Sequence, residues 1–202
     1  MFVQVIQGKA KDPAGLKKQW DRWDQEIKPG ASGYLGGTAG VTADSEFIAL
    51  ARFESEEAAR ANSDNAEQSK WWEETSQYLD DVMFHDCTEV DLYEGGGSDD
   101  AGFVQVMQGK TTDMKAAREL EAKMNDRMKE MRPDILGSIT AIHPENGRYT
   151  SAIYFQSEAE ARVKEKEMES AEGFQEYMGQ WQAISDGEPK FLDLTEPWYS
   201  SK

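Results

Sequence analysis

The sequence is poor in cysteine, histidine and basic residues. It contains a single cysteine, Cys87, in 202 residues, which excludes an internal disulfide framework. Its 22 Lys and Arg residues are outnumbered by 39 Asp and Glu residues, so the formal net charge is −17. Such an acidic surface repels phosphate backbones and anionic lipid headgroups. We therefore expect neither nucleic acid nor a membrane as a partner.

Long apolar runs are missing too. No stretch approaches the roughly 18 apolar residues that a membrane-spanning helix needs, and the N-terminus begins with a strand pattern rather than a basic and then apolar signal. Together with the lone cysteine, this predicts a cytoplasmic protein. The only histidines, His85 and His143, occupy different places in the two halves of the chain, so we expect no metal site.

What the sequence does contain is an internal repeat. The segment Phe2–Lys9 reads FVQVIQGK and returns as FVQVMQGK at Phe103–Lys110, with seven of eight residues identical at a spacing of 101. The segment FESEEAAR at Phe53–Arg60 returns as FQSEAEAR at Phe155–Arg162, at a spacing of 102. Two copies of one small-domain-sized unit therefore fill the chain.

A glycine-rich, acidic stretch separates the two copies. It reads EGGGSDDAG and has almost no apolar side chains, which is typical of a linker. We expect four segments: repeat 1 (1–93), the linker (94–102), repeat 2 (103–195) and a C-terminal tail (196–202). In the tail, Trp198 and Tyr199 are expected to dock onto a neighbouring surface.

Both repeats predict the element order β-α-β-β-α-β. The predicted elements of repeat 1 are a strand at 2–7, a helix from Pro13 to Pro29, strands at 33–42 and 46–53, a helix from Ser55 that is interrupted near 62–66 and continues through Leu79, and a strand at 84–92. Those of repeat 2 are a strand at 103–108, a helix at 114–131, strands near 135–143 and 148–155, a helix from Ser157, and a strand at 191–194.

This order is that of the ferredoxin-like fold, in which helices cover one face of an antiparallel sheet. The other face must be covered by something else. In the first strand Val3 and Val5 point to one face and Phe2 and Ile6 to the other, so both faces are expected to be buried. The simplest cover is the sheet of the sister repeat. The predicted fold class is therefore α+β: two tandem ferredoxin-like repeats packed sheet to sheet as an intramolecular dimeric α/β barrel. Further dimerisation stays open.

Three features carry a resemblance to a known family. They are the FVQV opening of each repeat, the aromatic and then Ser-Glu-x-x-Ala run that begins at Phe53 and again at Phe155, and the Trp-containing second helix. These resemble the dimeric α/β-barrel superfamily, and more narrowly its antibiotic-biosynthesis-monooxygenase-like branch, over nearly the whole chain. The resemblance implies subunits that pair through their sheets, pockets between sheet and helices, and no cofactor.

The resemblance also covers haem-degrading proteins, which carry an amide residue on the first strand and a Trp and a His on the second helix. Gln7 lies close to the amide position. The Trp and His positions fall near Arg60 and Lys70, where neither residue type is retained. Haem degradation is therefore not expected.

Repeated amides and clustered tryptophans are the ligand-binding candidates. Amides inside an apolar strand must find partners, so one pair could hold a substrate carbonyl or hydroxyl group in each repeat, or the amides could bond within the sheet. Tryptophans concentrate in repeat 1, where they could form the walls of a site for a flat ligand or belong to the core. The candidates are Gln4, Gln7, Trp23, Trp72, Gln105 and Gln108.

His85 is the candidate for acid–base catalysis, because it lies beside Asp86 and Cys87. The alternative is an exposed or locally bonded histidine, since no set of nucleophile, base and orienting group is visible. The glycine-rich segment 30–40 is expected to bend or bulge the second strand beside a cavity. If one repeat alone is open, we expect it to be repeat 1.

Two functions stay open at this point. The first is a small-molecule-binding protein, for a small apolar or aromatic ligand, that acts as a cofactor-independent monooxygenase-like enzyme on an aromatic or polyketide-like substrate. The second is a non-catalytic stress-response or protein-interaction module of the same fold.

Overall fold

The computed structural model describes residues 1–144 and 147–202 of the chain. The chain divides into two compact units. Unit 1 comprises Met1–Val90 and Glu196–Lys202, and unit 2 comprises Asp91–Thr195. Among the described residues, no helix is both long and apolar enough to cross a membrane.

Unit 1 is built on a five-stranded antiparallel sheet with the strand order β10-β2-β3-β1-β4. Its strands are β1 (Phe2–Ala10), β2 (Tyr34–Val41), β3 (Glu46–Phe53), β4 (Leu79–Cys87) and β10 (Trp198–Ser200). In the centre of the sheet, Val5 of β1 lies opposite Leu50 of β3 on one side and His85 of β4 on the other.

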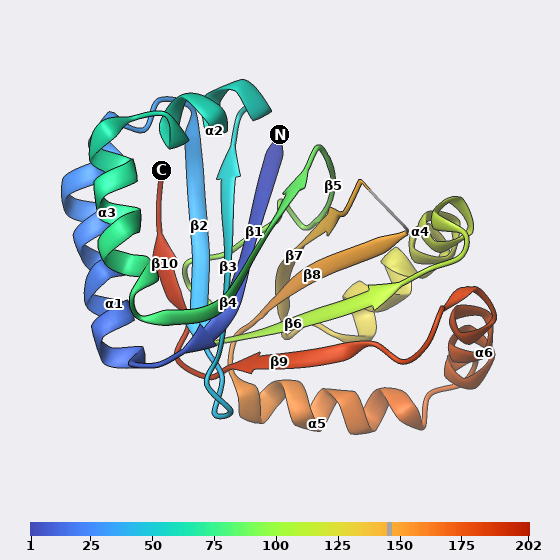
Figure 1. The fold of residues 1–202 in the computed structure, drawn as a ribbon. Coiled ribbons are helices and arrows are strands. Elements are labelled where there is room, and N and C mark those ends of the chain that lie inside the picture. Colours follow the sequence, from blue (N-terminus) through green and yellow to red (C-terminus); the bar gives the residue numbers. More distant parts are fainter. Residues whose placement is uncertain (145–146) are drawn as a thin grey trace. The chain divides into compact units, whose positions relative to one another are not determined.

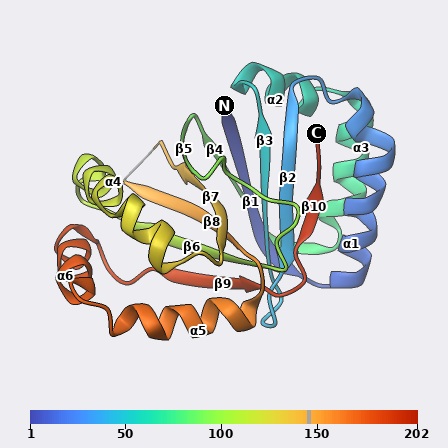
Figure 2. The same ribbon diagram turned by 180° about the vertical axis from the view of Figure 1, so that it is seen from behind.

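The helices of unit 1 are α1 (Pro13–Arg22), which continues as the π-helical turn η1 (Trp23–Ile27) and the 3₁₀ turn η2 (Lys28–Gly30), then α2 (Glu56–Ser63) and α3 (Ala66–Ser76). Figures 1 and 2 show α1 and α3 side by side along the sheet. Side chains cap the starts of α1 and α2. Asp12 accepts a hydrogen bond from the Gly15 amide at 3.0 Å, and Ser55 accepts one from the Ala58 amide at 3.1 Å.

The glycine-rich segment bulges β2, as predicted. The register between β2 and β3 shifts between Tyr34 and Gly36, and Gly36 has a φ of 123°, which favours glycine. At Gly37, an added Cβ would lie 2.5 Å from the Tyr34 hydroxyl group, so the close approach also requires glycine. Unit 2 carries the same register shift between Ile135 and Gly137. The bulge is therefore common to both repeats.

Unit 2 repeats the plan with a sheet of the order β5-β7-β8-β6-β9. Its strands are β5 (Glu89–Tyr93, which begins at the end of unit 1), β6 (Phe103–Lys110), β7 (Ile135–Ile142), β8 (Arg148–Phe155) and β9 (Lys190–Leu194). Its helices are α4 (Met114–Met131), α5 (Glu158–Glu169) and α6 (Phe174–Ile184). The observed α4 has the predicted bounds. The chain is thus a tandem pair of ferredoxin-like α+β units.

The edges of the two sheets differ from the prediction. The strand expected at 84–92 is two strands, β4 and β5, and β5 joins the sheet of unit 2. The helix expected to reach Leu79 ends at Ser76, because Leu79 instead pairs with Ala10 in the sheet and is buried there. The C-terminal tail forms β10 at the edge of unit 1, where Trp198 lies opposite Ala39.

The glycine-rich segment between the repeats packs closely on unit 2. A Cβ added at Gly97 would lie 3.1 Å from the Tyr154 hydroxyl group, and one at Gly137 would lie 2.0 Å from the Gly96 carbonyl oxygen. The glycines therefore allow a close approach of backbone to β7 and β8, rather than acting as a free tether.

Both faces of the two sheets are buried along the central strands β1 and β6. Phe2 and Ile6 face the helices of unit 1, whereas Val3 and Val5 point to the opposite face and are 0% exposed. Val104 and Val106 occupy the equivalent places in unit 2 and are also 0% exposed. That each sister sheet covers the other stays a prediction.

Candidate functional site

Unit 1 has an apolar cavity between the sheet and the helices α1 and α3. Its volume is about 320 Å³, including the part open to solvent. The lining residues are Ile6, Leu16, Trp20, Phe47, Ala49, Trp71, Trp72, Thr75 and Trp198. The one hydroxyl group among them, that of Thr75, already donates to the Trp71 carbonyl oxygen at 2.7 Å. The walls therefore offer aromatic rings and methyl groups, and no charge.

Helical spacing and strand pairing bring these residues together. Leu16 and Trp20 lie one turn apart on α1, so both face the sheet. On the sheet, Ile6 of β1 lies directly opposite Ala49 of β3. The small Ala49 side chain leaves the space into which the tryptophans project, and Trp198 closes the β10 side.

Two of the indole rings are fixed by hydrogen bonds. The Trp71 N–H group donates to the Gln19 carbonyl oxygen at 2.9 Å, and the Trp20 N–H group donates to the Tyr199 carbonyl oxygen at 3.4 Å. Both bonds tie α1 to its neighbours, α3 and β10. The two rings therefore form permanent walls of the cavity.

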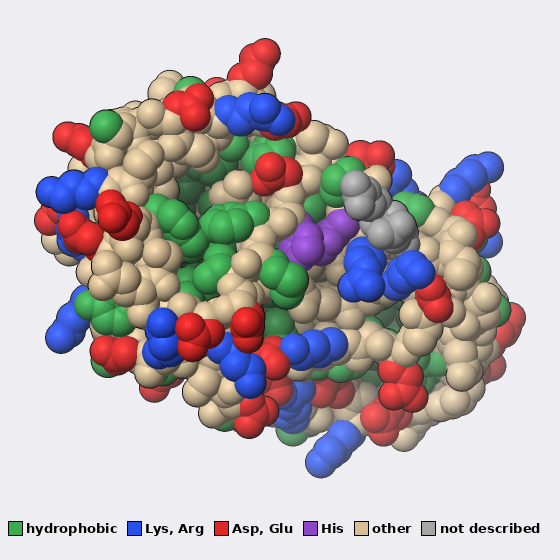
Figure 3. Space-filling view, in the orientation of Figure 1, with side chains coloured by type: hydrophobic (Ala, Val, Ile, Leu, Met, Phe, Trp, Pro, Cys, Tyr) green, Lys and Arg blue, Asp and Glu red, His purple; other side chains and the backbone are tan. Residues whose placement is uncertain are grey.

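Trp72 of the lining also contacts Phe84 of β4. Their rings meet edge to face with centroids 5.2 Å apart, and Phe84 is 46% exposed. Figure 3 shows hydrophobic side chains gathered in a hollow on this part of the surface. The closed inner part has room for about two water molecules. A ligand larger than this requires side chains of the lining to move.

Of the candidates from the sequence, only Trp72 lines this cavity. Trp23 is buried in a separate cluster, 4.8 Å from Tyr34 between ring centroids, and its N–H group donates to Gln68 at 2.6 Å. The adjacent residues Trp71 and Trp72 both line the cavity, Trp71 buried and Trp72 partly exposed.

Gln4 and Gln105 bond across their sheets. The Gln4 side-chain amide donates to Asp86 at 2.8 Å, and the Gln105 amide donates to Asp193 at 2.9 Å. Each pair joins directly opposite residues of neighbouring strands. The two repeats thus keep one amide–carboxylate pair at the same place, and Gln4 is not among the residues that line the unit 1 cavity.

Gln7, Gln108 and His85 lie on the other face of their sheets. Gln7 and His85 share the face of Val5, because residues alternate along β1 and His85 is directly opposite Val5. The Gln108 amide donates to the Thr150 hydroxyl group at 3.2 Å, and that oxygen lies 3.0 Å from Nε2 of His143. The structure therefore does not bring Gln7 or His85 together with Trp72.

Cys87, two residues after His85, is buried and unreactive in character. Burial raises the pKa of its thiol to about 12, and the neighbouring Asp86 carboxylate adds to the shift. It acts as a small apolar residue of β4.

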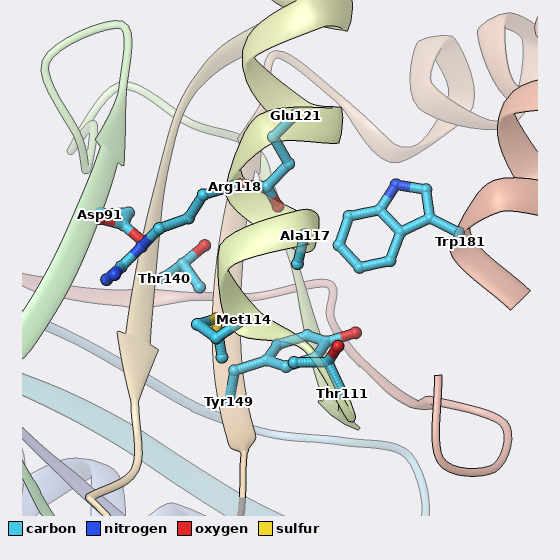
Figure 4. A pocket seen from close by; sticks show the side chains of 9 residues that line it. All are labelled: Asp91, Thr111, Met114, Ala117, Arg118, Glu121, Thr140, Tyr149 and Trp181. Atoms are coloured by element: carbon cyan, nitrogen blue, oxygen red, sulfur yellow. The ribbon is translucent and has the colours of Figure 1, made fainter. Parts of the chain in front are cut away.

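Unit 2 has a second cavity, of about 280 Å³ including its open part, between the sheet and the helices α4 and α6. Figure 4 shows Arg118 reaching toward Asp91 on one side of α4, with Trp181 pointing at Ala117 on the other. The lining residues are Asp91, Thr111, Met114, Ala117, Arg118, Glu121, Thr140, Tyr149 and Trp181. In contrast to the cavity of unit 1, this cavity has charged and hydroxyl-bearing side chains in its lining.

The titratable groups of this second cavity are perturbed. Burial raises the pKa of Glu121, the Asp91 carboxylate raises it further, and Arg118 partly offsets both. Burial also raises the pKa values of Tyr149, which lines the cavity, and of Tyr177 on the helix α6, with a contribution from the charge of Glu121 in each case. Arg118 itself is paired with Asp91 at 2.7 Å.

Each unit is a ferredoxin-like domain with a hollow between its sheet and its helices, a place where such folds can hold a ligand. No family model matches the sequence, and no curated protein matches it. Solved structures do share the fold along the chain's whole length.

Three of these structures define the likeness. One is a Fusobacterium nucleatum protein described as a "putative monooxygenase", 12% identical, with a TM-score of 0.73 over 100% of this chain and 94% of that one. Another is an anthrone oxidase-like protein, 10% identical, with a TM-score of 0.67 over 100% and 94%. The third is a Listeria monocytogenes ferredoxin-fold protein related to antibiotic biosynthesis monooxygenases, 8% identical, with a TM-score of 0.50 over 100% and 95%. The predicted resemblance is confirmed at the level of the fold.

Proposed function

We propose that the chain is a small-molecule-binding protein whose unit 1 takes up a flat, neutral, apolar ligand between the sheet and helices α1 and α3. The observation that supports this proposal is the lining of one cavity by the indole rings of Trp20, Trp71, Trp72 and Trp198. Flat rings with fixed positions stack on a flat ligand with little loss of side-chain freedom.

The chemistry of the lining narrows the ligand class. No charged side chain lines the cavity among the described residues, and its one hydroxyl group is already bonded. A charged ligand would lose its hydration without gaining a partner. A polycyclic aromatic compound, such as an anthrone or another polyketide-like molecule, fits these walls.

The fold neighbours suggest cofactor-independent, monooxygenase-like chemistry on that ligand, and we extend the proposal to it. In such a reaction an electron-rich substrate supplies the electrons for oxygen itself. The protein then contributes a dry and oriented environment. Unit 1 is suited to that role, because its walls are apolar and hold no acid or base.

Binding is tested with 1,8-dihydroxyanthrone as the probe. Tryptophan fluorescence is titrated, and the melting temperature of unit 1 is measured. At a ligand concentration 100 times Kd, binding stabilises the folded state by about 2.7 kcal/mol, which raises the melting temperature by several degrees. Oxygen uptake with the same probe tests the catalytic part.

The matched variants are Ala49→Leu, which fills the cavity, and Ala51→Leu, which enlarges a residue on the same strand and face that does not line it. The proposal predicts that Ala49→Leu abolishes the response and that Ala51→Leu keeps it. A wild-type protein that does not respond to the probe, or an Ala49→Leu variant that responds fully, would favour the non-catalytic interaction module instead.

A further inference from the structure

The two cavities occupy matching places in the repeats but differ in chemistry at matching residues. The helix caps Asp12 and Asp113 are 101 residues apart, and at this spacing Trp20 of α1 corresponds to Glu121 of α4. The strands β3 and β8 are 102 residues apart, which pairs Phe47 with Tyr149. All four residues line a cavity. Two aromatic positions of unit 1 are therefore polar in unit 2.

The edge strands β10 and β5 also differ in the polarity of the residue that they contribute to the cavity. In unit 1 β10 contributes Trp198 to the cavity, and in unit 2 β5 contributes Asp91. A repeated fold that merely fills its interior would keep these places apolar, because burying a polar group without a partner costs free energy. The polar side chains of unit 2 therefore point to a ligand with which they can bond.

Two polar groups in unit 2 bond to no residue of the described part of the chain, and both keep contact with solvent, since no buried side-chain oxygen or nitrogen there lacks a hydrogen-bond partner. Tyr149 is 9% exposed, and no residue in the described part of the chain makes a hydrogen bond with its hydroxyl group. The carboxyl group of Glu121 likewise has no hydrogen-bond or ion-pair partner within residues 1–144 and 147–202. The other polar groups of the lining are engaged: Arg118 with Asp91, Thr140 with Ser151 at 2.8 Å, and Thr111 with the Ile184 carbonyl oxygen at 2.9 Å.

The remaining walls are apolar, and the closed part between them has room for about one water molecule, so an aromatic ring would lie in the open part of the cavity. Met114 and Ala117 of α4 line one side, and the indole ring of Trp181 lines the side toward α6 (Figure 4). A charged ligand of either sign would meet a like charge, because Arg118 and Asp91 both border the cavity. A neutral ligand avoids this repulsion.

We propose that the unit 2 cavity is a second binding site, for a small neutral aromatic molecule that carries a hydroxyl group, held by hydrogen bonds to the Glu121 carboxyl and Tyr149 hydroxyl groups. The two repeats then bind different ligands: unit 1 binds its ligand through apolar stacking, and unit 2 binds its ligand through hydrogen bonds to a hydroxyl group. This site does not depend on the ligand proposed for unit 1.

The test uses ¹⁹F NMR titration of the full chain with 4-fluorophenol. Three probes of similar size are compared with it: 4-fluorotoluene, 4-fluorobenzoate and 4-fluorobenzylamine. The variants are Tyr149→Phe and Glu121→Met, each of which removes one hydrogen-bonding group without adding bulk. Their matched controls are Tyr154→Phe, on the same strand but the opposite face, and Glu119→Met, an exposed residue of the same helix.

The proposal predicts that 4-fluorophenol binds more tightly than the other three probes. Tyr149→Phe and Glu121→Met should each weaken its binding by about 5- to 10-fold, the effect of losing one hydrogen bond. The two control variants and Ala49→Leu in unit 1 should bind it as the wild type does. No binding of 4-fluorophenol, a preference for a charged probe, or binding unchanged in both cavity variants would each overturn the proposal.

Discussion

The substitution Trp198→Ala probes how the C-terminal residues build the site of unit 1. Trp198 lies opposite Ala39 in the β10–β2 pair, and its ring centroid is 6.5 Å from that of Trp20 and 6.3 Å from that of Phe47. The ammonium group of Lys17 lies 6.0 Å from the ring centre. Although it is far from these residues in sequence, Trp198 closes one wall of the cavity.

The expected loss of stability follows from how deeply the Trp198 side chain is buried. Removing a fully buried Trp or Phe side chain costs about 3–5 kcal/mol, and Trp198 is half-buried. A partly exposed cation–π contact adds about 0.5 kcal/mol. We therefore expect Trp198→Ala to lower the free energy of unfolding of unit 1 by about 2–3 kcal/mol and to leave unit 2 unchanged.

Hydrogen–deuterium exchange with mass spectrometry measures the stability of each unit separately. Amides of β2 and β3 should lose protection in Trp198→Ala, whereas amides of β6 and β8 should keep it. Trp181→Ala is the mirror control, because it removes a half-buried tryptophan from unit 2. Equal loss of protection in both units, or a change below about 0.5 kcal/mol in unit 1, would refute the reasoning, since a half-buried Trp contributes more than that.

Three further predictions concern charge and protonation. Asp134→Asn leaves the buried Arg132 without its anionic partner, so urea denaturation should show a loss of about 3–5 kcal/mol, against almost none for the exposed Asp126→Asn. Because the pKa of Glu121 is raised in the folded state, its protonation stabilises the folded state at a pH below the ordinary pKa of 4.5, and this stabilisation is lost as the pH rises through the raised pKa. Glu121→Gln should therefore be more stable than the wild type at neutral pH. An equal pH dependence of stability in both proteins would contradict this. Cys87, with a pKa of about 12, should resist iodoacetamide at pH 8 until the protein unfolds, so rapid labelling of the native state would disprove its burial.

The fold was predictable because the same pattern of strands and helices occurs in both repeats of the sequence. The recurrence of FVQV at Phe2 and Phe103 and the helix caps at Asp12 and Ser55 rest on local sequence, and the structure bears them out. The strand β10 was not predictable as a strand, since its three residues have no periodic pattern of their own. Its pairing with β2 is a tertiary contact.

The sequence predicted the type of site, an aromatic pocket in repeat 1, but only some of the residues that line it. Helical spacing indicated that tryptophans of α1 and α3 cover the sheet, and Trp72 borders the cavity. Gln7 and His85 lie on the wrong face, because alternation along a strand decides orientation and the pairing of β1 with β4 is set only in the folded chain. Glu121 and Tyr149 were missed, although comparing the repeats position by position would have exposed them.

The central claim, that the unit 1 cavity binds the ligand, is tested most directly by methyl NMR. In a complex with 1,8-dihydroxyanthrone, we predict nuclear Overhauser effects from the ligand to the methyl groups of Ile6, Leu16 and Ala49, which line the cavity. Effects confined to Val3 and Val5, on the opposite face of the sheet, would contradict it, as would the absence of any contact with unit 1.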